Sequence, residues 1–461
     1  MRYLIHVTLL LSFMLATASS SSLYHGNGNY LFTNRKMSNS FPNQEAINES
    51  YAVVFDAGST GSRVHVFRFN QRLDLLRIGE DLELFVATEP GLSAYEKNPQ
   101  EAAQSLVPLL EEAESVVPEE LQPRTPLQLG ATAGLRLLEG DAAEKILEAV
   151  RDMFEKNSTF KVESDAVSVL GGSQEGAYMW VAINYLLGKL GKPYSKTAAV
   201  VDLGGGSVQM AYALSEKDAE KAPNAPDGTD PYITQTFVSG KKYYLYVHSY
   251  LGFGQLAARA GVLNITADSN SPCILAGFNG NYTYNGVDYN ASALPSGSSF
   301  SKCKQLVLKS LNVNETCTHK NCTFGGIWNG GGGKGQTNFW VASFFYDMAK
   351  QAGFIDSNAP NAKVRPVDFK TAAELACKTT LKDVKSTFPL LEDRNLPYIC
   401  LDLTYQHTLL VDGFGLDPWK EITLVTQIEY QNSLVGAAWP LGTAIEAVSS
   451  LPKFDKLVYF I

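Results

Sequence analysis

Residues 53–67, VVFDAGSTGSRVHVF, constrain the fold of this chain more than any other stretch. An apolar run ends at Asp56, a turn of small residues follows from Ala57 to Ser62, and strand-like composition resumes at Val64. This pattern predicts a β-hairpin. The tip of such a hairpin exposes backbone N–H groups and hydroxyls with no large side chain in the way, so it can cradle a phosphate.

The same design recurs at residues 198–211, AAVVDLGGGSVQMA, where Asp202 stands in the place of Asp56. A single Gly-Ser turn after a strand usually makes only a hairpin, so one copy alone says little. Two copies, each led by an aspartate, indicate a duplicated site for an oligophosphate. We therefore predict that the two hairpin tips face one another.

Length and charge bound the class of protein. A chain of 461 residues is long enough for roughly two or three domains with substantial cores. The net charge of −9 argues against a general nucleic-acid binder. Because few basic residues stand near the two hairpins, a divalent metal ion is expected to supply the positive charge that a polyanionic substrate needs.

The N-terminus carries a targeting pattern. Arg2 precedes an apolar stretch at 4–16, and the small residues at 16–18 resemble a cleavage site. We predict a signal peptide over 1–20, followed by a polar, flexible leader over 21–47, and hence a protein of the secretory pathway, extracellular or in a secretory lumen. An uncleaved signal anchor is the alternative, and no other run reaches membrane-spanning length.

Cysteines and glycosylation sequons also favour an oxidising compartment. The six cysteines all lie in the second half of the chain without the spacing of a zinc site, and the pattern alone leaves their pairing open. Sequons crowd into the same region, which predicts a glycosylated surface. They stand at Asn48, Asn157, Asn264, Asn281, Asn290, Asn314 and Asn321.

Strand and helix patterns alternate along the chain, which predicts an α/β fold. Strand composition covers 73–87 and 161–170, and the segment 127–138 indicates a strand, a turn and the start of a helix. The glycine-rich stretch 325–335 fails the P-loop pattern, because no Ser or Thr follows its lysine, and is predicted to be a loop. Helices are predicted at 98–117, 141–156, 175–187, 241–260, 339–351 and 434–448.

Cleavage of a phosphate anhydride needs charge neutralisation, an aligned nucleophile and a base. Asp56 and Asp202 are expected to hold a hydrated divalent cation, which prefers oxygen ligands. Glu175 follows a glycine-rich bend in the first turn of a predicted helix, and it is the carboxylate expected to deprotonate an attacking water. No serine or cysteine nucleophile with a defensible histidine partner appears, so direct attack by water is expected.

These roles have structural alternatives. A carboxylate in the first turn of a helix, such as Glu175, also interacts favourably with the helix dipole. Arg63 and Arg136, the basic residues nearest the hairpins, are also explained as partners in structural ion pairs.

Five segments carry a family resemblance, and they are DAGSTGSR at Asp56, GATAGLRLL at Gly130, GGSQEGAYMW at Gly171, DLGGGSVQM at Asp202 and AAWPLG at Ala437. Together they resemble the apyrase regions of the nucleoside triphosphate diphosphohydrolases, and the match is closest to the soluble plant apyrases, also described as lectin nucleotide phosphohydrolases. Actin, hexokinase and exopolyphosphatase relatives share a similar phosphate hairpin, so the specificity lies in finding all the segments in order.

The resemblance implies two actin-like (RNase H-like) domains with the active site in the cleft between them. Domain I would cover 48–171 and 431–461, and the disulfide- and sequon-rich domain II would cover 172–430. The implied reaction is stepwise hydrolysis of nucleoside tri- and diphosphates, such as ATP and ADP, to the monophosphate and phosphate with Ca²⁺ or Mg²⁺.

Site residues follow from the resemblance position by position. It implies Glu175 as the general base and Thr132 as a residue that positions the water or the terminal phosphate. It also implies that Asp56, Asp202 and Gln209 arrange the hydrated metal. The implied phosphate-binding residues are Ser59, Thr60, Gly61, Ser62, Arg63, Ala133, Gly204, Gly205, Gly206 and Ser207.

The resemblance extends to the base and to the disulfides. Relatives stack the base between an aromatic residue and an arginine, for which Tyr346 and Arg394 are the candidates; the alternative is a core tyrosine and a solvated loop charge. Trp439 is expected to pack at the cleft floor. The implied disulfides are Cys273–Cys303, Cys317–Cys322 and Cys377–Cys400.

Two other functions stay open at this point. The aromatic, sequon-rich second half motivates a carbohydrate-binding, lectin-like surface protein with an oligosaccharide ligand and secondary or vestigial hydrolysis. An exopolyphosphatase would release phosphate from polyphosphate with little activity on ADP. A nucleic-acid partner is not expected.

Overall fold

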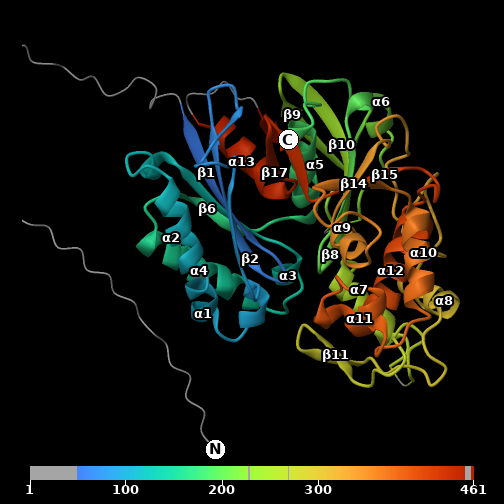
Figure 1. Cartoon of the computed structure of the whole chain (residues 1–461). Coiled ribbons are helices and arrows are strands. Elements are labelled where there is room, and N and C mark those ends of the chain that lie inside the picture. The colour runs from blue at the N-terminus through green and yellow to red at the C-terminus, as the bar shows by residue number, and fades with distance from the viewer. Residues whose placement is uncertain (1–48, 227–228, 268, 452–457, 461) are drawn as a thin grey trace, which may run out of the picture. The chain divides into compact units, whose positions relative to one another are not determined.

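The computed structural model describes residues 49–226, 229–267, 269–451 and 458–460, which belong to one compact unit. The predicted signal peptide and leader lie outside these residues. Two large mixed sheets organise the described residues, and helices cover the faces of both sheets (Figure 1). Among the helices described, none has the length and apolarity required to cross a bilayer.

The first sheet has the strand order β3-β2-β1-β5-β6, with β4 also paired to β2. Strands β1 and β2 form an antiparallel hairpin, whereas β1 with β5 and β5 with β6 are parallel pairs. The strands are β1 (Ser50–Ala57), β2 (Ser62–Phe69), β3 (Leu75–Leu76), β4 (Leu84–Thr88), β5 (Pro126–Ala131) and β6 (Lys161–Val169). The segment 73–87, predicted as one continuous strand, is thus split between β3 and β4.

The second sheet repeats this arrangement in the order β10-β8-β7-β13-β15, extended by β14 at one edge and by β9 and β18 at the other. Here β7 and β8 form the antiparallel hairpin, and β7, β13 and β15 run parallel. The strands are β7 (Ala199–Leu203), β8 (Ser207–Leu214), β9 (Ile233–Val238), β10 (Lys241–Leu251), β13 (Phe339–Ser343), β14 (Asn361–Val364), β15 (Ile422–Val425) and β18 (Val458–Phe460). Short ribbons are β11 (Asn281–Tyr284) with β12 (Val287–Asn290), and β16 (Gln427–Tyr430) with β17 (Ser433–Gly436).

Matching strands place the two aspartates at matching positions. Asp56 on β1 lies opposite Gly130 of the parallel strand β5, and Asp202 on β7 lies opposite Ala342 of the parallel strand β13. A central strand with a hairpin partner on one side and parallel strands on the other is therefore built twice. The α/β class, with two RNase H-like sheets, is confirmed.

Helices divide the apolar residues among distinct cores. Alternate residues of β1 point to opposite faces: Val53 packs with α1, α2 and α4, whereas Val54 shares a core with α5 and α13. This second core also takes in Val200 of β7, so α5 and α13 join the two sheets. The helices are α1 (Pro99–Gln104), α2 (Val107–Val116), α3 (Ala133–Arg136), α4 (Ala142–Asn157), α5 (Gly172–Leu186), α6 (Glu216–Ala219), α7 (Gln255–Asn264), α8 (Phe300–Ser310), α9 (Phe344–Gln351), α10 (Pro366–Ala376), α11 (Val384–Thr387), α12 (Ile399–Thr408) and α13 (Trp439–Ser449).

The contact between α5 and α13 is close because one residue lacks a side chain. A methyl group on Gly442 would collide with the backbone of Tyr178. The hydroxyl of Tyr178 donates to the carboxylate of Glu446 on α13 at 2.6 Å.

The predicted domain boundaries stay a prediction. The end of the chain, which was assigned to domain I, differs from them, because β18 pairs with β9 of the second sheet.

Three predicted helices are partly wrong. The range 241–260 forms strand β10 before α7 begins, 339–351 begins with strand β13, and 434–448 begins within β17. Aromatic and β-branched residues favour strands, but strands buried on both faces show no alternation that would distinguish them from helices. The predicted helix 98–117 is interrupted between α1 and α2.

All three implied disulfides are confirmed. The structure joins Cys273 to Cys303, Cys317 to Cys322 and Cys377 to Cys400. The bonded cysteines lie between Cys273, which follows α7, and Cys400, which is in α12.

Candidate active site

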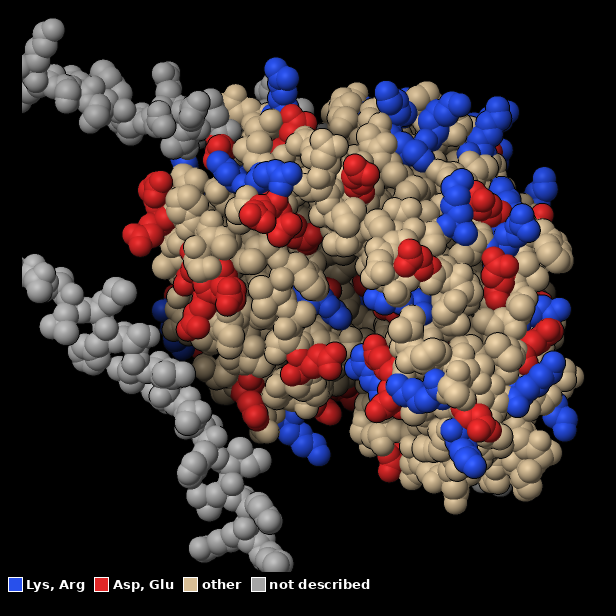
Figure 2. Space-filling model, viewed as in Figure 1, with Lys and Arg blue, Asp and Glu red and all other residues tan. Residues whose placement is uncertain are grey.

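A cleft of about 710 Å³ opens at the ends of the central strands of both sheets. Figure 2 shows it as a hollow with acidic and basic side chains on both sides of its mouth. Most of the predicted site residues line it, and these are Asp56, Ser59, Thr60, Arg63, Thr132, Glu175, Asp202, Gly204, Gly205 and Arg394.

The two hairpin turns share one hydrogen-bond pattern. The N–H of Gly58 donates to the carbonyl of Gly61 at 3.0 Å, and the N–H of Gly204 donates to the carbonyl of Ser207 at 3.0 Å. Within the described part of the chain, the amides of the two following residues in each turn donate to no protein acceptor; they are Ser59 and Thr60, and Gly205 and Gly206. Unpaired, converging amides of this kind are what an anion needs.

The hairpin tips meet across the cleft. A methyl group on Gly205 would collide with the hydroxyl of Ser59, and one on Gly206 would lie 2.8 Å from the Cβ of Ala133. Larger residues at these glycines would push the tips apart. The prediction that the hairpins face one another is confirmed.

Helix α7 orients the second hairpin from behind. The carbonyl of Gly204 accepts from the N–H of Gln255 at 2.8 Å, and the carbonyl of Gly205 accepts from the N–H of Leu256 at 2.9 Å. The carbonyl of Gly206 accepts from Gly252 at 2.8 Å. Because these carbonyls are already bound to amides of the chain, the hairpin offers an incoming phosphate its unpaired N–H groups.

Glu175 stands in the first turn of α5 and is 7% exposed. Its Oε2 accepts from Nη2 of Arg136 at 2.5 Å and from Nε2 of Gln209 at 3.1 Å. Oε1 has no protein partner within the described residues, and the side chain lines the cleft. Burial raises the pKa of Glu175 to about 8, Arg136 opposes this, and the charges of Asp202 and Asp56 add to it.

The hydroxyls behind Glu175 complete a polar network. Ser249 on β10 accepts from Arg136 at 3.3 Å and from Gln209 at 3.0 Å, and Ser207 accepts from Gln209 at 2.7 Å. These contacts fix both donors that hold Glu175. The sequence left open whether Arg136 serves the phosphate hairpins or a structural ion pair, and the structure shows it as an ion-pair partner of Glu175.

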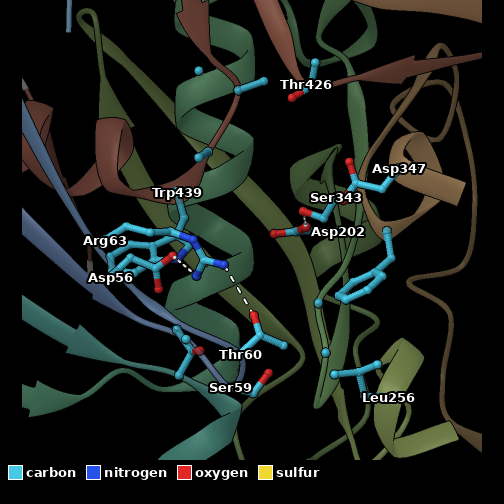
Figure 3. A pocket seen from close by; sticks show the side chains of 18 of the residues that line it. Asp56, Ser59, Thr60, Arg63, Asp202, Leu256, Ser343, Asp347, Thr426 and Trp439 are labelled. Carbon is cyan, nitrogen blue, oxygen red and sulfur yellow. Dashed lines mark hydrogen bonds and ion pairs between the residues drawn. The ribbon is translucent and has the colours of Figure 1, made fainter. Parts of the chain in front are cut away.

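Asp56 and Asp202 lie on opposite sides of the cleft (Figure 3). Asp56 pairs with Arg63 at 3.3 Å, and Arg63 also donates to Thr60 at 3.4 Å. Asp202 accepts from the hydroxyl of Ser343 at 2.6 Å. Burial, followed by the charge of Asp56, raises the pKa of Asp202 to about 6 despite this hydrogen bond.

A hydrated divalent cation suits this donor set. Asp56 and Asp202 repel one another, and a cation near them would relieve that repulsion. The buried Oε1 of Gln209 has no hydrogen-bond partner in the described residues. Those residues contain no cluster of three or more His, Cys, Asp or Glu side chains that would cage a metal directly. Few protein ligands and retained waters are typical of Mg²⁺ in phosphate sites.

Several predicted site residues lie behind the cleft surface. Ser62, Ser207 and Gln209 are buried in the strands that carry the hairpins. Tyr346 takes the alternative position that the sequence left open, that of a core tyrosine: it is 4% exposed, packs in the core of the second sheet, and donates its hydroxyl to the carbonyl of Ala359. Arg394 is exposed at the cleft and pairs with Glu392.

Among the cleft residues that sequence reasoning missed are Leu256, Ser343, Phe344 and Asp347. The last three were missed because 339–351 was predicted as one helix, so the end of β13 at Ser343 was not recognised. A strand that ends beside β7 would have placed Ser343 next to Asp202. Trp439, expected at the cleft floor, lines the cleft and is buried, and its ring packs so closely on Gly130 that a methyl group there would lie 2.7 Å from it.

Two RNase H-like sheets, with aspartate-led hairpins that meet across a cleft, define the actin-like class of phosphate-binding proteins. The model of the GDA1/CD39 (nucleoside phosphatase) family matches residues 43–458. The chain belongs to this family.

Relatives are similar to this chain in sequence over most of its length. The chain is 56% identical over 456 residues to a nucleoside-triphosphatase from Pisum sativum, covering 99% of this chain and 98% of that protein. It is 56% identical over 402 residues to an apyrase from Solanum tuberosum, with 87% and 88% covered. A crystal structure of nucleoside triphosphate hydrolases from Neospora caninum has a TM-score of 0.58 at 14% identity, covering 87% of this chain and 92% of that one. That likeness concerns the fold alone.

Proposed function

We propose that this protein is an apyrase, which hydrolyses nucleoside tri- and diphosphates to the monophosphate and phosphate by direct attack of water. One observation carries the proposal: the free Oε1 of Glu175 lines the same cleft as two amide cradles that meet tip to tip. The names and high identity of the relatives from Pisum sativum and Solanum tuberosum support it.

Different residues of the cleft have different roles in the proposed hydrolysis. Amides of the two hairpins bind the phosphates, and the hydroxyl of Thr132, at the end of β5, positions the terminal phosphate or the water. Ionised Glu175 accepts a proton from that water at Oε1, while Arg136 and Gln209 hold Oε2 in place. The water oxygen forms a new bond to the terminal phosphorus while the anhydride P–O bond to the rest of the nucleotide breaks. The terminal phosphate then leaves as inorganic phosphate.

Ca²⁺ or Mg²⁺ would be held by Asp56, Asp202 and Gln209, in part through water. When bound, such a cation neutralises charge on the phosphates and lowers the pKa of nearby acids. The acidic character of the cleft supports this assignment, since a polyanion would otherwise be repelled.

A secretory location with N-linked glycans is part of the proposal. The disulfides favour an oxidising compartment. The sequon asparagines that the structure describes are exposed or partly exposed, and they are Asn157, Asn264, Asn281, Asn290, Asn314 and Asn321. Mass spectrometry of the native protein would give the mature N-terminus and any glycan masses.

Phosphate release from ATP, ADP, AMP and polyphosphate, with and without Ca²⁺ or Mg²⁺, tests the activity. We expect release from ATP and ADP that depends on the cation, and none from AMP. Glu175→Gln should lower kcat about 1,000-fold or more and leave nucleotide binding nearly intact. Near-normal release by that variant would contradict the mechanism.

The alternatives make different predictions in the same assay. An exopolyphosphatase would favour polyphosphate and leave ADP nearly untouched. The structure adds no observation in favour of the carbohydrate-binding alternative, which stays a prediction from the sequence.

A further inference from the structure

Asp347 is a carboxylate of the cleft that the proposed hydrolysis does not use. It stands in the first turn of α9 and is exposed to the cleft. Figure 3 shows it on the same side as Ser343 and Asp202. It makes no hydrogen bond or ion pair with any residue that the structure describes, so both of its oxygens are available as acceptors.

The neighbouring hydrogen-bond acceptors of this wall, Gln351 and Glu392, already have partners. Gln351, one turn further along α9, accepts from Asn395 at 3.0 Å and donates to Glu392 at 3.3 Å. Glu392 also accepts from Arg394 at 2.7 Å. Asp347 thus stands out among them as an acceptor without a donor.

Asp347 follows Ser343 along the chain and is not one of the hairpin residues that we assign to the phosphates. Ser343, at the end of β13, holds Asp202 beside the hairpins, and Asp347 is four residues further along, a rise of about 6 Å on a helix. The unpaired amides that attract phosphate oxygens belong to the hairpins, whereas a carboxylate without a cation repels them, so we expect the phosphate chain at the hairpins. The part of a nucleotide that follows the phosphates, and that offers neutral donors, is the ribose.

We propose that Asp347 accepts hydrogen bonds from the ribose hydroxyls of the substrate and thereby selects ribonucleotides. This inference rests on the proposed nucleotide hydrolysis. The two oxygens of a carboxylate match the two donors of a vicinal diol, and acidic residues bind ribose hydroxyls in this way in dinucleotide-binding folds. Leu256 and Phe344 line the same cleft and offer apolar surface to the base.

A substrate series measures this contact directly. The kcat/KM values of ATP, 2′,3′-dideoxy-ATP, ITP and inorganic tripolyphosphate are compared for the wild type, Asp347→Asn and Asp347→Ala. We expect the wild type to prefer ATP over dideoxy-ATP by about tenfold or more, because a site built to bind a hydroxyl discriminates against its absence. Both variants should lose most of this preference, while hydrolysis of dideoxy-ATP and tripolyphosphate changes less than about twofold.

Glu392→Gln is the matched control, because it removes a negative charge from the same wall at a residue that already has a partner. It should keep the preference for ATP. An unchanged preference for ATP in the Asp347 variants would overturn the proposal, as would an equal loss on all substrates. A change confined to ATP against ITP would also overturn it, since that would indicate a contact with the base. If the wild type hydrolyses no nucleotide at all, the proposed function fails instead, which is a distinguishable outcome.

Discussion

At the scale of single residues, the proposed hydrolysis depends on the protonation state of Glu175. Burial and the charges of Asp202 and Asp56 favour its protonated form, whereas the guanidinium of Arg136 favours the carboxylate. Only the carboxylate can accept a proton from water. The rate should therefore rise with pH up to the pKa of Glu175, about 8 without a cation, and a bound cation should move the rise to lower pH.

Arg136→Gln tests this balance. The substitution removes the positive charge that lowers the pKa of Glu175, so the pKa rises and the ascending limb of the kcat/KM profile moves to higher pH. Activity at pH 7 should fall about tenfold or more, with a partial recovery toward pH 9. A profile that falls by the same factor at every pH would show that Arg136 does not tune Glu175.

The site residues that could be predicted from the sequence are those next to a glycine-rich turn. Asp56, Asp202 and Glu175 stand beside glycine-rich bends whose conformation follows from local sequence. Tyr346 was misplaced because nothing local distinguishes an aromatic residue that faces a cleft from one that faces the core. Asp347 was missed for a related reason: an exposed acid on a helix carries no pattern until the fold shows what it faces.

At the scale of elements, α7 supports the second hairpin and is itself tied to α12 by a buried ion pair. Arg259 donates to both oxygens of Asp402, at 2.8 and 2.6 Å, and its guanidinium lies 4.6 Å from the ring centre of Tyr398. Gln255, in the first turn of α7, adds a hydrogen bond to Asp402 at 2.9 Å. The pair fixes the helix end that binds the carbonyls of the hairpin.

Asp402→Asn should destabilise the protein by about 3–5 kcal/mol, because it leaves the guanidinium of Arg259 buried without its counter-charge. Urea unfolding should show a lower midpoint with an unchanged slope. Glu374→Gln is the control, since its pair with Lys370 is half exposed and should contribute less than about 1 kcal/mol. Equal stabilities of the two variants would contradict this account of α7.

Elements with a hairpin or amphipathic pattern could be predicted from the sequence, whereas doubly buried strands could not. The hairpins β1–β2 and β7–β8 have clear turn residues between apolar runs. Strand β13 is apolar on both faces and continues directly into α9, so its pattern does not change where the structure does. The same ambiguity hid β10.

At the scale of the whole molecule, two copies of one strand arrangement meet so that the tips of their hairpins face one another. Helices α5 and α13 share a core with strands of both sheets, and they approach one another closely at Gly442. This duplication could be predicted because the pattern of an aspartate followed by a turn of small residues occurs twice in the sequence. The strands added at the edges, such as β14 and β18, carry no such repeat.

A crystal structure of the Glu175→Gln variant with ATP and Ca²⁺ tests the central claim most directly. The account predicts that the terminal phosphates contact the amides of Ser59 and Thr60 on one side and of Gly205 and Gly206 on the other. It also predicts a water in line with the terminal phosphorus, within hydrogen-bond distance of the side chain at position 175. Phosphates bound away from either hairpin, or a side chain at 175 that points out of the cleft, would contradict it.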